Sequence, residues 1–529
     1  MKIERIPFTD VPQFSRRDVA YATGSDDLRK FYGYEVTRDA FARAIKDKSR
    51  DSTDRDLLAD TLRQQYLALG LESSIPENVT LLRSAQTYTV ITAHQPSLFT
   101  GPLYYILKIC STINLARQLK AAYPEQDFVP VFISGAEDHD FEEINHAQVY
   151  GNRIEWSDNA GGPVGALKTE TLGQALSALK DVLGDRDTAE GMYARIERAY
   201  TEHETYGAAA VALVHDLFGK EGLVVADMSH KNFKAAFAPL MEKEIFESPS
   251  QALIEKAQGE LEELGYSGQA HAREINLFYL SPSRRDRIVR QGNGYAIHGT
   301  DQTFTADELR QELHDHPERF SPNVVMRPLY QELIFPNLAY IGGGGELAYW
   351  LERKEQCAAF GLNFPMLIRR NSVLWIDKGN QKKLEKLDLD YRKLFRPADL
   401  IIRDYVAEQS DNELSLADEL KQLESLFHGI AAKAEEIDPT LAKAAMGEHA
   451  RQAKAVENLE GRLRRTEKQR FETSMNQIRG LRDKLFPDNG MQERYDSYLN
   501  IYLQQGESMF ATLIEHLDPL EPGLVVIQP

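Results

Sequence analysis

The residues of this chain that could do chemistry gather in a short acidic stretch, Glu137-Asp138-His139-Asp140. Clustered carboxylates repel one another unless a cation or hydrogen-bond donors offset their charge. Such a group could orient an amine or accept a proton as a general base, so Asp138, His139 and Asp140 are our candidate catalytic residues. A purely structural interpretation also fits, because acidic residues are favoured where a helix begins and Asp140 could cap one. The pattern leaves both interpretations open.

A metal site is a further interpretation of the same stretch. If a helix begins near Asp140, then His139, Glu143 and His146 fall on one of its faces. The spacing differs from the HExxH pattern of zinc proteases, so we assign no metal. It nevertheless keeps one alternative function open, a metal-dependent hydrolase that uses Asp138, His139 and Asp140.

Two other loops carry residues suited to ligand binding. The first contains His94 and Gln95, and Gly101 would let the backbone approach a ligand. The second is Gly342-Gly343-Gly344-Gly345, where the absence of side chains leaves room for a ligand or phosphate, although close helix packing would also require glycine. The remaining substrate-binding candidates are Glu346, Tyr349 and Trp350 after the glycines, and Asn145, Asp227 and Arg327.

The elements that would position these loops are strands followed by helices. An apolar run at 88–93 predicts a buried strand, 103–123 an amphipathic helix and 128–134 a second strand, which together form the βαβ unit of a parallel sheet. Ligands of such sheets bind where strands end at their carboxyl side, so we expect one cavity lined by these loops. Further strands are predicted at 222–226 and 337–341, a helix from 346 to 360, and a closing strand at 373–376.

Composition and spacing divide the chain into three parts. We expect an N-terminal helical segment at 1–80 that packs on the core, and a C-terminal helical domain at 378–529. Between them, 81–377 is predicted to be a parallel α/β core with insertions at about 147–220 and 271–327.

The C-terminal part is predicted to form two long antiparallel helices and a last helix at about 495–517. Apolar residues recur at spacings of four and three from Leu416 to Ile437, and the pattern resumes from Val456 to Leu485. Asp438-Pro439 should break the helix and begin the next. The helices could pack only on themselves, or they could form a coiled coil between two chains; we expect a homodimer.

The bulk composition narrows the function classes. A formal net charge of −19 disfavours nucleic-acid binding. No apolar run approaches the roughly 20 residues of a membrane span, and the N-terminus lacks the apolar core of a signal peptide. The two cysteines, Cys110 and Cys357, exclude a disulfide framework and a cysteine-based zinc site. We expect a cytoplasmic protein that binds neither nucleic acid nor membrane.

Three stretches together, residues 94–104, 137–146 and 340–350, resemble the BshC family of bacillithiol synthesis, whose members are described as cysteine ligases. The resemblance extends over nearly the whole chain. It implies a Rossmann-like core interrupted by two connecting peptides, similar to class I aminoacyl-tRNA synthetases, and a C-terminal coiled coil that dimerises.

The same resemblance implies an activity, the addition of cysteine to the amine of glucosaminyl malate. Because amide formation in water is uphill, the carboxyl group must be activated, and the synthetase analogy suggests ATP and a cysteinyl adenylate. The expected partners are therefore cysteine, glucosaminyl malate and a nucleotide. Neither a clear HIGH nor a clear KMSKS motif is present, and Ser283-Arg284-Arg285 is a poor substitute for the second. Besides the hydrolase, a non-catalytic coiled-coil scaffold remains an alternative.

Overall fold

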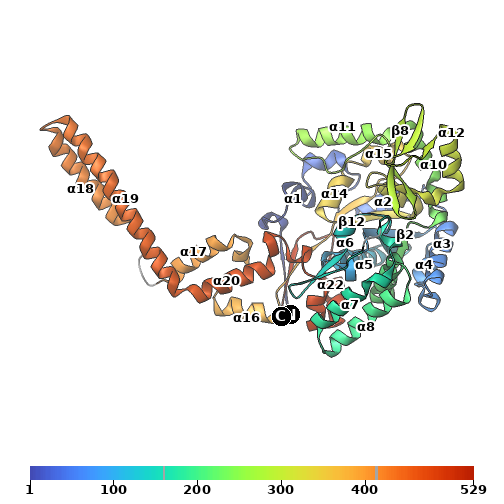
Figure 1. Cartoon of the computed structure of the whole chain (residues 1–529), viewed down its shortest axis with the longest axis horizontal. Helices are drawn as coiled ribbons and strands as arrows, with labels where there is room; N and C mark the ends of the chain where they lie inside the picture. The colour runs from blue at the N-terminus through green and yellow to red at the C-terminus, as the bar shows by residue number, and fades with distance from the viewer. Residues whose placement is uncertain (159–160, 411–414) are drawn as a thin grey trace. The chain divides into compact units, whose positions relative to one another are not determined.

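A computed structural model describes residues 1–158, 161–410 and 415–529 (Figure 1). By their internal contacts these residues divide into two units. The first comprises 1–375 and 492–527, and the second comprises 376–491 with 528–529. All the residues discussed below as a candidate site belong to the first unit.

The centre of the first unit is a five-stranded sheet in the order β13-β12-β2-β3-β6. Every neighbouring pair is parallel, which confirms the predicted Rossmann-like α/β core. Its strands are β2 (Thr87–His94), β3 (Asp127–Ser134), β6 (Val224–Asp227), β12 (Asn337–Gly342) and β13 (Met366–Arg369).

Both faces of this sheet are covered, because alternate residues of each strand point to opposite sides. On β3, Phe132 packs into the cluster that contains helices α5 (Tyr104–Ala122) and α9 (Tyr206–Phe218). Its neighbours Val131 and Ile133 pack into the cluster that contains α3 (Arg55–Ala68) and α10 (Lys231–Glu247). The near-continuous apolar runs of the sequence follow from this double burial.

The strand order creates a crossover point in the sheet. The chain runs from β2 through β3 to β6 and then returns to β12, on the other side of β2. The loops after β2 and β12 therefore diverge at the carboxyl edge of the sheet. In open parallel sheets ligands bind at this position.

The predicted closing strand belongs to a different sheet, so that prediction was wrong. The strand at 373–376 is β14 (Ser372–Trp375), which pairs in parallel with β15 (Leu524–Gln528) beside β1 (Lys2–Ile6). The fifth strand of the main sheet is β13, which ends at Arg369. Arg369 and Arg370 are both buried. Arg369 forms an ion pair with Asp18 and Arg370 forms one with Glu493, and the chain passes from one sheet to the other at this point.

Two long segments interrupt the core. Between β3 and β6 lie the hairpin of β4 (His146–Val149) and β5 (Asn152–Glu155) and helices α7 (Gly173–Leu183), α8 (Asp187–Glu202) and α9. Between β6 and β12 lies an antiparallel sheet in the order β10-β9-β8-β7-β11. Its strands are β7 (Leu277–Ser281), β8 (Arg284–Gln291), β9 (Gly294–Ile297), β10 (Thr303–Phe304) and β11 (Phe320–Pro322), accompanied by α11 (Pro249–Glu263), α12 (Ala306–Asp315) and α13 (Arg327–Ile334).

Both ends of the chain contribute to the first unit. The N-terminal segment supplies β1, α1 (Arg16–Ala22), α2 (Ala40–Lys48), α3 and α4 (Glu77–Leu81). The last predicted helix is in fact two, α21 (Leu499–Gln505) and α22 (Ser508–His516), because Gly506 adopts a φ of 60° between them. They pack on α8 and α5, so residues 492–527 lie outside the helical part in which the sequence had placed them.

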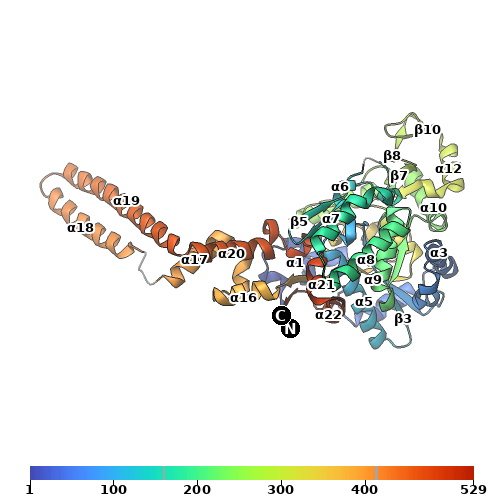
Figure 2. The same ribbon diagram turned by 60° about the horizontal axis from the view of Figure 1, so that its bottom comes forward.

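The second unit is helical, with α16 (Lys378–Lys386), α17 (Ala398–Gln409), α18 (Ala417–Glu435), α19 (Pro439–Arg470) and α20 (Glu472–Leu485). Helices α18 and α19 lie side by side and antiparallel (Figure 2), and the break at Asp438-Pro439 falls where it was predicted. Asp438 accepts a hydrogen bond from the Thr440 N–H at 2.7 Å. The pair leaves apolar side chains exposed, Leu426 at 60% and Ile437 at 81%; dimerisation stays a prediction. No helix among the described residues is long and apolar enough to span a membrane.

Candidate functional site

A cavity of 510 Å³ opens at the carboxyl edge of the main sheet, beside the crossover point. The loops after β2, β3, β6 and β12 all contribute to it, although they are far apart in the sequence. Of the predicted site residues, those that line it are His94, Gln95, Asp138, Asp227, Arg327, Gly343, Gly344, Gly345, Glu346, Tyr349 and Trp350. The structure thus brings the acidic stretch and the glycine turn to one cavity.

Two of the three candidate catalytic residues lie outside the cavity lining. The His139 side chain is half exposed, next to Phe278, and Arg285 Nη1 donates a hydrogen bond to its Nδ1 at 3.0 Å. Asp140 caps the short helix α6 (Phe141–Ile144) by accepting from the Glu143 N–H at 3.4 Å. Only Asp138 keeps the placement that the sequence suggested; for Asp140 the structural interpretation holds.

Three other predicted residues also lie outside the lining. Asn145 is buried at the base of the β4–β5 hairpin, where its carbonyl accepts from the Trp156 N–H. Gly101, with a φ of 61°, leaves no room for a side chain because a Cβ would lie 2.7 Å from Ser97. A Cβ on Gly342 would press on Tyr340, Glu346 and Leu347. These residues shape the loops but do not face the cavity.

The face that could have bound a metal does not form. Helix α6 has only four residues, and His146 lies in strand β4. Among the described residues, no group of three or more His, Cys, Asp or Glu side chains could hold a metal ion.

Asp138 is the centre of a charged network at one end of the cavity. Gln95 Nε2 donates to its Oδ2 at 2.7 Å, and Arg327 and Arg285 approach within 3.6 and 3.7 Å. Burial alone would raise the pKa of Asp138, but Arg327 and Arg285, together with hydrogen bonds from Gln95 and the His139 N–H, hold that pKa below its usual value. Asp138 is therefore ionised, which suits it to hold an ammonium group and makes it a weak proton acceptor.

Arg285 reaches this network from strand β8 of the second insertion. Its guanidinium lies 4.0 Å from the centre of the Phe278 ring, and burial lowers its pKa to about 10. Arg285 Nε donates to Ser321 Oγ, which in turn donates to Glu137 at 2.9 Å. Glu137 is paired with the buried Lys234 at 2.6 Å, so it serves as a structural tie between the core and the insertion.

Two further carboxyl groups of the cavity are better proton acceptors than Asp138. Burial, followed by the charges of Asp140 and Asp138, raises the pKa of Glu143, which also hydrogen-bonds with Gln95. Burial raises the pKa of Asp227, whose Oδ1 accepts from the Ser229 N–H at 2.9 Å. A base with a raised pKa takes a proton more readily near neutral pH.

In the glycine turn, some positions have no room for a side chain and one position has free space beside it. A Cβ on Gly344 would lie 2.5 Å from the Asp18 carboxylate of α1, so this glycine permits close packing of helices. The expectation that a side chain at Gly344 would fill the ligand space was wrong for that reason. A Cβ on Gly345 would meet nothing within 4 Å. The predicted helix after the turn is also broken, into α14 (Gly344–Trp350) and α15 (Lys354–Ala359).

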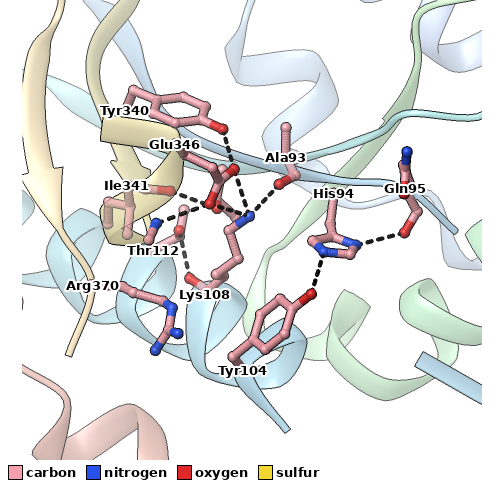
Figure 3. A network of polar contacts seen from close by, with 12 residues as sticks. Ala93, His94, Gln95, Tyr104, Lys108, Thr112, Tyr340, Ile341, Glu346 and Arg370 are labelled. Carbon is pink, nitrogen blue, oxygen red and sulfur yellow. Dashed lines mark hydrogen bonds and ion pairs between the residues drawn. The ribbon is translucent and has the colours of Figure 1, made fainter. Parts of the chain in front are cut away.

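A buried ion pair supports the turn from below (Figure 3). Lys108 of α5 is fully buried and donates to Glu346 at 2.8 Å and to the Ala93 carbonyl. Glu346 also accepts from Tyr340 Oη at 2.8 Å and from the Gly343 N–H at 2.9 Å. Burial opposes the charge on Glu346, but Lys108 brings its pKa below the usual value, so the pair is ionised.

His94 positions a tyrosine in the cavity wall (Figure 3). Its Nδ1 lies 2.8 Å from the Gln95 carbonyl, which can only accept, so Nδ1 carries the proton. Its Nε2 then accepts from Tyr104 Oη at 2.9 Å. Burial lowers the pKa of His94 to about 4, so the ring is neutral. The guanidinium groups of Arg370 and Arg494 lie over the Tyr104 ring, 5.4 and 6.0 Å from its centre.

Several residues of this cavity were missed by sequence reasoning. Those in the lining are Tyr104, Glu143, Arg285, Arg370 and Arg494, and Lys108 contacts the lining residue Glu346. Glu143 had been considered only as a metal ligand and Arg285 only as part of a poor motif match. Arg370 directly follows the unexpected strand β13. Arg494 comes from the segment that had been assigned to the helical domain, so no local pattern pointed to it.

The sequence matches two family models that together span the chain. Residues 1–371 match the N-terminal Rossmann-like domain of BshC, described under bacillithiol biosynthesis. Residues 373–529 match the C-terminal coiled-coil domain of the same family. This protein belongs to the BshC family.

Curated relatives agree with that membership over full length. A protein of Flavobacterium johnsoniae is 36% identical and one of Christiangramia forsetii 37% identical, covering 98% or more of each chain. A more distant relative from Bacillus thuringiensis is 28% identical over 90% of both chains. All three carry the name "Putative cysteine ligase BshC". The chain is thus a member of a ligase family of bacillithiol biosynthesis.

Among solved structures, an arginyl-tRNA synthetase from Campylobacter jejuni, itself titled "putative", aligns with 86% of this BshC chain and 96% of its own. Its sequence identity is 11% and its TM-score 0.22. The synthetase analogy therefore gains no support from this alignment.

Proposed function

We propose that this protein joins the carboxyl group of cysteine to the amine of glucosaminyl malate, forming the amide of bacillithiol, with ATP as the activating co-substrate. Family membership supports the reaction class and the pathway. The observation that carries the proposal is the charge arrangement of the cavity. At one end of the cavity, the ionised Asp138 and the proton-accepting Glu143 could bind an amine. At the other end, near Tyr104, Arg370 and Arg494 could bind an anion.

The proposed reaction has two steps. The cysteine carboxylate attacks the α-phosphorus of ATP, which releases pyrophosphate and leaves a cysteinyl adenylate. The amine nitrogen then attacks the carbonyl carbon, AMP departs, and the nitrogen loses one proton. No net oxidation or reduction occurs, so ATP is the only co-reactant that the reaction needs.

The acidic end of the cavity would serve the second step. Asp138 holds the amine as its ammonium form, because its low pKa keeps it charged. Glu143, the stronger base because its pKa is raised, takes the proton that frees the nitrogen lone pair for attack, and the second proton, which the nitrogen loses as AMP departs, passes to solvent. Gln95, hydrogen-bonded to both carboxylates, fixes their spacing.

The alternatives predict different outcomes in the same assay. A metal-dependent hydrolase would show metal-dependent cleavage and no ligation, and a scaffold would show neither reaction. Neither has a specific observation in its favour, because the described residues offer no three-ligand metal group and the cavity carries a dense set of ionisable side chains.

The test is a mass-spectrometric assay with purified protein, cysteine, glucosaminyl malate and ATP, each omitted in turn. We expect a product whose mass equals cysteine plus glucosaminyl malate minus water, formed together with AMP, and absent from every omission. Product in the absence of ATP would overturn the activation step. No product from the complete mixture, with folded protein, would overturn the function.

A further inference from the structure

The cavity has a corner near Tyr104 where one arginine has no carboxylate partner and another keeps an unpartnered N–H, among the described residues. Arg370 is 2% exposed, and its Nη2 donates to Glu493 at 2.8 Å while Nη1 donates to the Asn371 carbonyl at 2.9 Å. Its Nε, also buried, has no hydrogen-bond partner among the described residues. A buried N–H without a partner is costly and calls for an explanation, of which a bound ligand is one.

The orphaned N–H lies beside the glycine turn. A Cβ built on Gly343 would be 3.7 Å from Arg370 Nε, which places the donor next to backbone that carries no side chain. Glu493 fixes the orientation of Arg370, since the same carboxylate accepts from Ser372 Oγ and the Val373 N–H. The guanidinium is thus held in a fixed orientation beside the glycine turn, and Arg370 is part of the cavity lining.

A second arginine enters the corner from a distant part of the sequence. The segment around Arg494 docks on the start of α5, where the Leu103 N–H donates to the Asp496 carbonyl at 2.7 Å and Pro102 pairs with Ser497. Arg494 lines the cavity and lies over the same Tyr104 ring as Arg370. Within the described residues its guanidinium has no carboxylate partner.

The charges near Tyr104 are not all paired. Lys108 is paired with Glu346 and Arg370 with Glu493, while Arg494 and the carboxylate of Glu143 both act on Tyr104 without an ion pair between them. At the other end of the cavity, by contrast, the two arginines face Asp138. Arginine forks match phosphate oxygens well, and an arginine without an ion-pair partner beside an unpartnered arginine N–H favours a ligand that brings negative charge.

We propose that Arg370, Arg494 and the turn at Gly343 form the subsite for the phosphate groups of the nucleotide. The inference rests on the proposed function, which it deepens by assigning one end of the cavity to the nucleotide and the other to the amine substrate. The phosphate chain lies against Tyr104 and the glycine turn, beside the crossover point, while the amine lies at Asp138. Arg494 is the adjustable contact and Arg370 the fixed one.

The test measures binding before any chemistry. Isothermal titration of the full chain uses sodium pyrophosphate as the phosphate probe and L-malate as a dicarboxylate probe. The variant Arg494→Gln removes the exposed charge with little risk to folding. The matched control is Arg63→Gln, an exposed arginine on α3 outside this cavity lining.

We expect Arg494→Gln to weaken pyrophosphate binding by about tenfold or more, and Arg63→Gln to leave it unchanged. Malate binding should be unaffected by either variant. Equal pyrophosphate affinities in the two variants, or no pyrophosphate binding by the wild type, would overturn the assignment. A loss of malate binding in place of pyrophosphate binding would also overturn it and would assign the corner to a carboxylate.

The ligation assay separates failure of this inference from failure of the function. If wild-type protein makes product but Arg494→Gln has an unchanged KM for ATP, the function stands and the subsite is wrong. If no product forms, yet pyrophosphate binding depends on Arg494, the phosphate subsite stands and the ligase proposal falls.

Discussion

The two ends of the cavity differ in how their charges are compensated. At the Asp138 end, arginines, carboxylates and Gln95 contact one another across the core and the second insertion. At the Tyr104 end, Arg370 keeps an unpartnered Nε and Arg494 has no carboxylate partner in the part of the chain that the structure describes. A network of mutually paired groups suits reversible exchange of a proton or an ammonium group. Arginine groups that still lack a partner suit an anion that arrives with the ligand.

This difference has a structural origin. The Asp138 end is built from loops that follow β2 and β3 and from a strand of the insertion. The Tyr104 end combines the start of α5, the turn after β12, and residues near both 370 and 494. The balance of charge at each end can therefore be altered separately, and the following predictions test whether the two ends behave independently.

The largest effect is expected on the stability of the protein, from a change in the buried Lys108–Glu346 ion pair near Tyr104. Lys108→Met removes one partner of a fully buried ion pair and leaves Glu346 uncompensated, which should destabilise the protein by about 3–5 kcal/mol. Urea unfolding measures the change. The double variant Lys108→Met/Glu346→Gln should recover a large part of that loss. A double variant as unstable as the single one would contradict the account of this pair.

The next largest effect concerns the acidic stretch. Asp138→Asn should lower ligation by roughly a hundredfold, because the amide cannot hold the ammonium group by charge and the two arginines lose their common partner. His139→Ala should change the rate little, since this ring lies outside the cavity lining. Steady-state rates on folded variants decide the matter. Equal losses of ligation rate in the two variants would show that His139 also takes part in the reaction.

The glycine turn should show a smaller contrast between neighbours. Gly344→Ala places a Cβ against the Asp18 carboxylate and should destabilise the protein by about 1–3 kcal/mol. Gly345→Ala meets open space and should be neutral, or stabilising by up to about 1 kcal/mol in helix α14. Thermal and urea unfolding would compare them. The opposite order would show that the turn packs differently from this description.

The smallest effect is a shift of the pH profile. Glu143 must be deprotonated to accept a proton, so ligation should fall as the pH drops through its pKa. That pKa is raised by burial and then by Asp140 and Asp138, so the fall begins at a higher pH than for an ordinary glutamate.

Asp140→Asn removes one negative charge and keeps a side chain able to cap α6. The acidic limb should therefore move to lower pH by a few tenths of a unit, as expected for one partly screened charge. A limb that stays in place, or one that survives Glu143→Gln, would contradict the role of Glu143.

The sequence predicted the part of the site that depends on strand ends. Apolar runs such as those of β2 and β3 locate the strands, and parallel pairing then brings Gln95, Asp138 and the glycine turn to one edge. These residues belong to loops whose position follows from the fold class alone. The family resemblance, the Rossmann-like core and the helical C-terminal part were also confirmed, by the two family models that match the chain.

The direction of individual side chains could not be predicted in this way. Whether His139 faces the cavity depends on where helix α6 begins, and a helix of four residues has no periodic pattern. Asp18 packs on Gly344 from a helix more than three hundred residues away in the chain, so no local pattern showed that this glycine serves packing. Arg494 is brought in by tertiary contacts of a returning segment, which leave no local signature.

The most direct test of the division between the two ends is a comparison of Michaelis constants. Initial rates of the ligation are measured for wild type, Asp138→Asn and Arg494→Gln, with ATP and glucosaminyl malate each varied. We predict that Arg494→Gln raises the KM for ATP about tenfold and leaves that for glucosaminyl malate unchanged, whereas Asp138→Asn acts on glucosaminyl malate and kcat alone. A shift of the same constant by both variants would contradict the assignment of one end to the amine and the other to the phosphates.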